Sequence, residues 1–134
     1  MNTILTLPIP PSNNQLRIPI NRGNHPELIK SQSYRDWETL AHYKFVSFRN
    51  KFGVVIDTAS YNLQYQYKVR IFVKDKRKDI SNFDKAILDF MKGRVFTDDK
   101  WVSLSIQMPV LVDSKNPRVE IDLNPEIFST LNKY

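Results

Sequence analysis

Carboxylates, an amide and a lysine gather between residues 79 and 99 of this 134-residue chain. Asp79, Asn82 and Lys85 recur at three-residue spacing, and Asp98-Asp99 follows after the next expected helix. Carboxylate oxygens are the ligands that hard divalent cations such as Mg²⁺ and Mn²⁺ prefer. A lysine ammonium beside them can neutralise charge that develops on a phosphate. The pattern therefore predicts a metal site that acts on a polyanion.

The chain as a whole is basic, although much of its acid lies in one segment. It has 20 Lys and Arg against 14 Asp and Glu, a net charge of +6. An excess of positive charge favours a polyanionic partner such as nucleic acid, and a basic surface with no such partner is the alternative. Six of the 14 acidic residues fall close together: Asp75, Asp79, Asp84, Asp89, Asp98 and Asp99.

Composition excludes several other kinds of site. The chain has no cysteine, which excludes disulfides, thiolate zinc sites and a cysteine nucleophile. His25 and His42 are too few for a multi-histidine site. No apolar run approaches the ~20 residues of a membrane span, and a signal peptide is not recognisable. We expect a single domain over residues 1–134, located in the cytoplasm, with no membrane partner and no organic cofactor.

Hydrophobic periodicity predicts the elements that must position these residues. The predicted fold class is α/β, or more broadly α+β: a small single domain with a mixed sheet and two main helices. The two strongest patterns are an aromatic stripe of helical spacing from Tyr34 to Phe48 and strict alternation from Leu63 to Val73. The expected order is strand 3–7, loop 10–26 with a turn at 21–24, helix from 31 or 33 to 51, a possible strand 54–57, strand 63–73, helix 81–92, strands 101–112 and 119–123, and a short helix from 125.

These elements place the acidic segment at the ends of a strand and a helix. Asp79 lies between strand 63–73 and helix 81–92, where Ser81 is a suitable N-cap. That helix would carry Ser81, Lys85 and Asp89 on one face. A purely structural alternative is open at this point, because Asp-Asp is common in turns and Asp before a helix interacts favourably with the helix dipole.

The same residues carry a resemblance to a known family. Over most of its length the chain resembles the RusA family of Holliday junction resolvases, found in bacteria and many phages. Matching segments are Pro10-Pro11-Ser12-Asn13-Asn14, Asn21-Arg22-Gly23, Tyr34-Arg35-Asp36, Asp79-Ile80-Ser81-Asn82-Phe83-Asp84-Lys85-Ala86 with Asp89, and Asp98-Asp99.

The resemblance implies a Mg²⁺-dependent endonuclease, with Mn²⁺ as a substitute, that acts as a homodimer. Such enzymes bind four-way DNA junctions and cut two opposed strands symmetrically, which needs two sites related by a two-fold axis. By motif position Asp79, Lys85 and Asp99 are the expected catalytic residues. Asp79 and Asp99 are also the expected metal ligands, with Asp98 and Ser81 as further candidates. Asn82 has a supporting role.

One residue departs from the family pattern. Ser81 stands where the motif has a second carboxylate, so the site loses a negative charge and its affinity for metal should fall. The alternative function is therefore a junction-binding protein with weak or no catalysis.

Basic residues around the acidic segment are the expected DNA contacts. Phosphate contacts of this kind set affinity and its salt dependence rather than sequence preference. The candidates are Arg17, Arg22, Lys74, Lys76, Arg77, Lys78, Lys92, Arg94 and Lys100.

Overall fold

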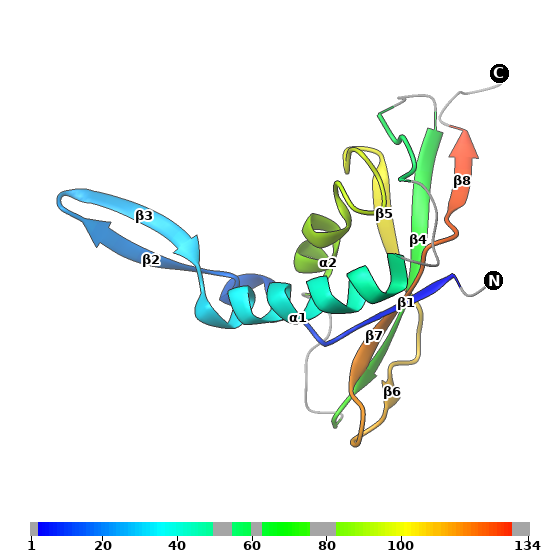
Figure 1. The fold of residues 1–134 in the computed structure, drawn as a ribbon, viewed down its shortest axis with the longest axis horizontal. Helices are drawn as coiled ribbons and strands as arrows, with labels where there is room; N and C mark the ends of the chain where they lie inside the picture. The colour runs from blue at the N-terminus through cyan, green and yellow to red at the C-terminus, as the bar shows by residue number, and fades with distance from the viewer. Residues whose placement is uncertain (1–2, 50–54, 60–62, 76–82, 130–134) are drawn as a thin grey trace.

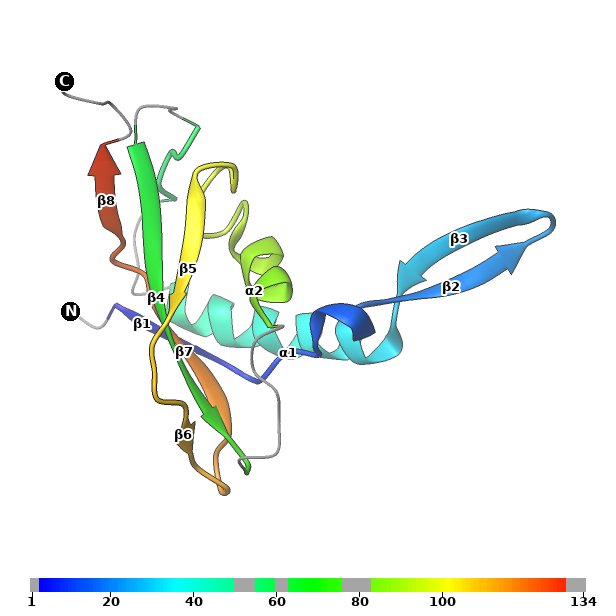
Figure 2. The ribbon, with the colours of Figure 1, turned by 180° about the vertical axis from the view of Figure 1, so that it is seen from behind.

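A mixed sheet with both helices on one face forms the body of the protein, and a two-stranded arm projects from it (Figures 1 and 2). The computed structural model describes residues 3–49, 55–59, 63–75 and 83–129. The sheet and two helices confirm the predicted fold class. None of the described helices is both long enough and apolar enough to cross a membrane.

Strand β4 (Leu63–Val73) is the centre of the sheet. Its alternating sequence produces alternating burial, as predicted, because successive side chains of a strand point to opposite faces. The inward set is buried: Tyr65, Tyr67, Val69, Ile71 and Val73. Burial raises the pKa of the Tyr67 hydroxyl to about 12.

Two interrupted strands flank β4. On one side β5 and β6 pair with it in parallel, and on the other side β7 and β8 pair with it antiparallel. At the outer edge β1 pairs antiparallel with β7. The bounds are β1 Ile4–Leu7, β5 Val102–Ile106, β6 Leu111–Val112, β7 Arg118–Asp122 and β8 Glu126–Ser129.

The two helices cover the inward face of this sheet. Helix α1 (Gln32–Arg49) buries the predicted aromatic stripe, and α2 (Asp84–Met91) buries Ile87 and Phe90. The ring of Phe90 contacts the Trp37 ring edge-on, with centroids 5.6 Å apart. Helix α2 is the crossover between the parallel strands β4 and β5, so it runs back along the sheet, as such connections require.

The arm corrects the prediction of a loop over 10–26. After a short 3-10 turn η1 (Asn13–Gln15), strands β2 (Arg17–Arg22) and β3 (His25–Lys30) form an antiparallel hairpin. Pro19 and Pro26 argue against strands at these positions when only the sequence is considered, because proline cannot donate a hydrogen bond to a neighbouring strand. The hairpin tolerates both prolines because each of its two strands has a free edge. The predicted turn is confirmed at Gly23-Asn24, whereas Asn21 and Arg22 belong to β2. Gly23 has the positive φ of 64° that favours glycine.

Three other predictions of local structure also need correction. The expected C-terminal helix is strand β8, because residues 126–129 pair with the first half of β4. Strand 101–112 is broken between β5 and β6 by a cis Met108-Pro109 bond. In the expected strand 54–57 only Ile56 forms an isolated bridge, to Phe96, and Val54 lies outside the described residues.

Candidate metal centre and nucleic-acid interface

The Asp98-Asp99 turn is fixed by a threonine from a distant segment. The Thr58 hydroxyl donates to the backbone carbonyl of Asp98 and accepts the Asp98 N–H at 3.0 Å. Thr58 is fully buried. The Thr97 hydroxyl beside it donates to the Asp57 carboxylate at 3.1 Å and accepts the Thr58 N–H at 3.0 Å. The two carboxylates of the turn are therefore carried on a rigid backbone, as a preorganised site requires.

Those two carboxylates have different surroundings. Asp98 accepts the Lys100 N–H at 3.0 Å, so its side chain closes its own turn. Asp99 lies 3.7 Å from the Lys92 ammonium, and both side chains are partly exposed. This ion pair is easily exchanged for a cation because exposed pairs contribute little free energy. Asp99 is accordingly the more available ligand of the two.

Thr58→Val is expected to lower the free energy of unfolding by about 1–3 kcal/mol. Valine keeps the shape of the buried threonine but leaves the part-buried Asp98 N–H without its acceptor. Urea unfolding measures the change. Thr39→Val is the matched control, because Thr39 is exposed and its hydroxyl, among the described residues, bonds only to the Arg35 carbonyl. An equal loss in both variants would contradict the buried anchor.

Two of the predicted catalytic residues flank α2 in the sequence, Lys85 at its start and Asp99 after its end. Lys85 is an exposed side chain in its first turn. Asp99 lies beside Lys92, just after its last turn, and the helix rises about 10 Å between these two lysines. Two residues of the predicted polar face are confirmed, because Lys85 and Asp89 are both exposed while Ile87 is buried. The helix begins at Asp84 instead of 81, and the third predicted residue, Ser81, lies outside the described residues.

Several predicted site residues lie outside the described residues: Asp79, Ser81, Asn82, Lys76, Arg77 and Lys78. Within the described ranges no three His, Cys, Asp or Glu side chains gather closely enough to hold a metal ion. The donors that are described, Asp98 and Asp99, are hard oxygen ligands of the kind that Mg²⁺ and Mn²⁺ take. The residues present thus fit such an ion in chemistry, with Asp79 and Ser81 as the remaining candidates.

The described DNA-contact candidates do not form one cluster. Arg22 lies on the arm and pairs with Glu27 at 3.3 Å. Lys74 is exposed just beyond the end of β4. The Lys100 ammonium lies 5.3 Å from the centre of the Trp101 ring. Among the described candidates, Lys100 adjoins the Asp98-Asp99 turn and Lys92 pairs with Asp99.

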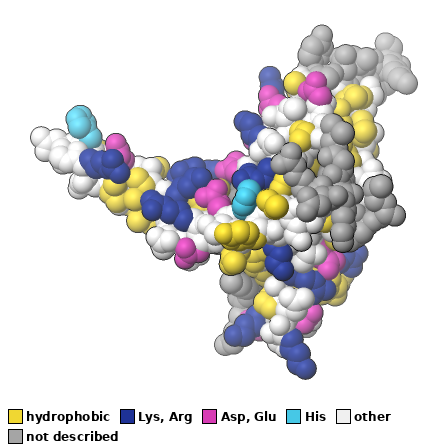
Figure 3. All heavy atoms as spheres, viewed as in Figure 1, with side chains coloured by type: hydrophobic (Ala, Val, Ile, Leu, Met, Phe, Trp, Pro, Cys, Tyr) yellow, Lys and Arg dark blue, Asp and Glu magenta, His cyan; other side chains and the backbone are white. Residues whose placement is uncertain are grey.

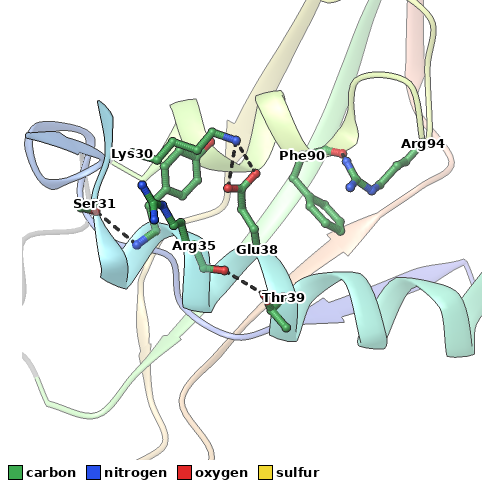
Figure 4. Close-up of polar contacts among 8 residues, drawn as sticks. Lys30, Ser31, Arg35, Glu38, Thr39, Phe90 and Arg94 are labelled. Carbon is green, nitrogen blue, oxygen red and sulfur yellow. Dashed lines mark hydrogen bonds and ion pairs between the residues drawn. The ribbon is translucent and has the colours of Figure 1, made fainter. Parts of the chain in front are cut away.

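A further basic region lies where the arm joins the body (Figure 3). Lys30 binds both carboxylate oxygens of Glu38 at 3.0 Å, and Arg94 donates to the Phe90 carbonyl at 3.0 Å while stacking on its ring (Figure 4). Arg35 is exposed on α1 in the same region. The surface therefore offers phosphate contacts on α1, in the turn after α2 and on the arm.

Sequence reasoning missed two supporting residues, Thr58 and Asn13. The amide of Asn13 binds Asp84 and Lys85 at the start of α2. Thr58 has no local signal, because its partner is 40 residues away. Asn13 does have one, since it falls in the Pro-Pro-Ser-Asn-Asn segment at 10–14.

A family model described as endodeoxyribonuclease RusA matches residues 8–124. The matched range contains the arm, both helices, the Asp98-Asp99 turn and the segment 76–82. A comparison with curated proteins found no match.

Proposed function

Because the chain belongs to the RusA family of endodeoxyribonucleases, we propose that it resolves four-way DNA junctions by paired symmetric nicks that require Mg²⁺ or Mn²⁺. The observation that carries this proposal is the family match over residues 8–124. The rigid carboxylate turn at Asp98-Asp99 and the overall charge of +6 support it. Paired cuts need two sites, so the active form is a homodimer with two-fold symmetry.

Each site residue has a proposed role. Asp79 and Asp99 hold the metal, with Asp98 and Ser81 as further ligands. When bound, such a cation activates water and stabilises the leaving oxygen. Lys85 supplies a positive charge for the phosphate in the transition state. Asn82 supports the ligands by hydrogen bonding. This activity would be exercised in the cytoplasm of a bacterium or a phage-infected host, where branched DNA arises.

A second candidate function follows from Ser81. A hydroxyl is a neutral and weaker ligand than the carboxylate that the family pattern has there, so a metal site built on Asp79 and Asp99 would carry one negative charge fewer. Under this alternative the protein binds junctions without cutting them, or cuts them slowly.

One assay separates these functions. A synthetic four-way junction and a linear duplex of the same length are incubated with the protein, with and without Mg²⁺ or Mn²⁺. Metal-dependent nicks at symmetric positions in opposed strands support the resolvase. Selective binding of the junction without nicks supports the binding protein. Equal binding of junction and duplex, without nicks, would contradict both.

Neutralising Lys76, Arg77 and Lys78 together is expected to flatten the salt dependence of junction binding. If each contacts a phosphate, the slope of log K against log salt concentration falls by about 2 to 3. Fluorescence anisotropy over a range of salt concentrations measures it. The control neutralises Lys44, Lys68 and Lys115, which changes the net charge equally. The same slope change in both variants would remove the 76–78 segment from the interface.

A further inference from the structure

Helix α2 begins without a cap of its own. The first four N–H groups of a helix have no partner within the helix, and a side chain at the N-cap position usually accepts one of them. In α2 that position is Phe83, which has no side-chain acceptor and is only 2% exposed. The N–H of Lys85, the second residue of the helix, therefore needs an acceptor from elsewhere.

Asn13 supplies that acceptor. Its Oδ1 accepts the Lys85 N–H at 3.3 Å, while its Nδ2 donates to the Asp84 carboxylate at 2.9 Å. One amide thus satisfies a donor and an acceptor in the same helical turn. An ionised carboxylate in its place could accept from Lys85 but could not donate to Asp84.

The segment that carries Asn13 is itself held firmly. The Ser31 hydroxyl donates to the Gln15 carbonyl at 2.7 Å, and the Ser31 N–H donates to the Leu16 carbonyl at 2.8 Å. Leu16 is 2% exposed. On the other side the Trp37 indole N–H donates to the Pro8 carbonyl at 2.8 Å. Asn13 therefore transmits the position of α1 to the first turn of α2.

We propose that Asn13 is a positioning residue of the nuclease, which fixes the first turn of α2 and with it Lys85. This inference rests on the proposed function, in which Lys85 acts on the phosphate. In this proposal the Asp84 carboxylate accepts a hydrogen bond from Asn13 and does not bind a metal ion. The segment 8–16 then contributes to catalysis by positioning Lys85, although it lies outside the acidic motif.

Exchanging the two groups tests the assignment. Asn13→Asp brings two carboxylates together without a donor, and kcat for junction nicking should fall by about tenfold or more. Asp84→Asn alone leaves two facing amides and should lose less. In the double variant the new carboxylate at 13 accepts both the Lys85 N–H and the new amide at 84, with the net charge unchanged, so kcat should return to within about threefold of the original.

Amide hydrogen exchange provides a reading that does not depend on cleavage. Asn13→Ala should speed exchange at the Lys85 N–H by roughly five- to tenfold. The matched control is Asn14→Ala, because Asn14 is exposed and its side chain bonds only to the Ser12 hydroxyl among the described residues. If the original protein fails to nick junctions, the proposed resolvase function is wrong. Exchange at the Lys85 N–H still tests whether Asn13 holds the first turn of α2. Unchanged exchange in Asn13→Ala, or no recovery in the double variant of an active enzyme, would overturn the role of Asn13.

Discussion

Asp99→Asn is expected to slow junction nicking by about a hundredfold or more while junction binding persists. The variant keeps the shape of the side chain and removes the charge that a metal ion needs. It also removes the ion pair with Lys92, so one positive charge is released near the DNA and affinity should not fall. Single-turnover nicking of a labelled junction measures the first effect, and binding in the presence of a chelator measures the second.

Two further substitutions serve as comparisons for the Asp99→Asn variant. Asp36→Asn changes an exposed carboxylate on α1 that bonds only to Gln32 among the described residues, and nicking should be unaffected. Asp98→Asn should cost less than Asp99→Asn, because an amide oxygen can still accept the Lys100 N–H. If Asp98→Asn is the more damaging variant, Asp98 is the main ligand of this turn. Full activity in Asp99→Asn would exclude the turn from the metal site.

Ser81→Asp is expected to raise nicking at limiting Mg²⁺ by about ten- to a hundredfold. The new carboxylate restores a negative charge between Asp79 and Lys85, and the affinity of oxygen-ligand sites rises with the number of charged ligands. The Mg²⁺ concentration that gives half-maximal nicking should fall. Titration of Mg²⁺ against the single-turnover rate measures both quantities.

Ser81→Asn is the matched control, since it adds similar volume without charge. A gain in Ser81→Asp alone, from a protein that binds junctions but hardly cuts them, supports the binding-protein alternative for the original sequence. No gain in a protein that already cuts efficiently means that another ligand takes the place of residue 81, and it would refute a weakened site.

Sequence predictions were correct for elements whose own residues determine their structure, and wrong for elements that depend on partners far away in the chain. The alternation from Leu63 to Val73 and the aromatic stripe of α1 fix both elements through their own burial. Residues 126–129 have no such pattern. They form a strand because β4 extends beyond β7 and leaves its first half free for them.

The candidate site shows the same division. The Asp98-Asp99 turn and the exposed face of α2 follow from residues that are neighbours in sequence. Thr58 and Asn13 act on partners 40 and 71 residues away. No local spacing predicts these contacts, although Asn13 lies in a segment that matches the family pattern. The course of α2, which carries Lys85 at its start, likewise depends on the direction of the crossover between β4 and β5, which is a property of the sheet.

The pairing of β1 with β7 has a consequence for how the protein is made. Thr3 and Asp122, which are joined by a side-chain hydrogen bond, lie 119 residues apart. At about 5–20 residues per second, roughly 6 to 24 s of translation separate the two strands. During that time Leu5 and Leu7, which are 1% exposed in the finished fold, have no sheet to enter. Strand β1 is thus made long before the strand it pairs with, and the burial of its two leucines waits for β7.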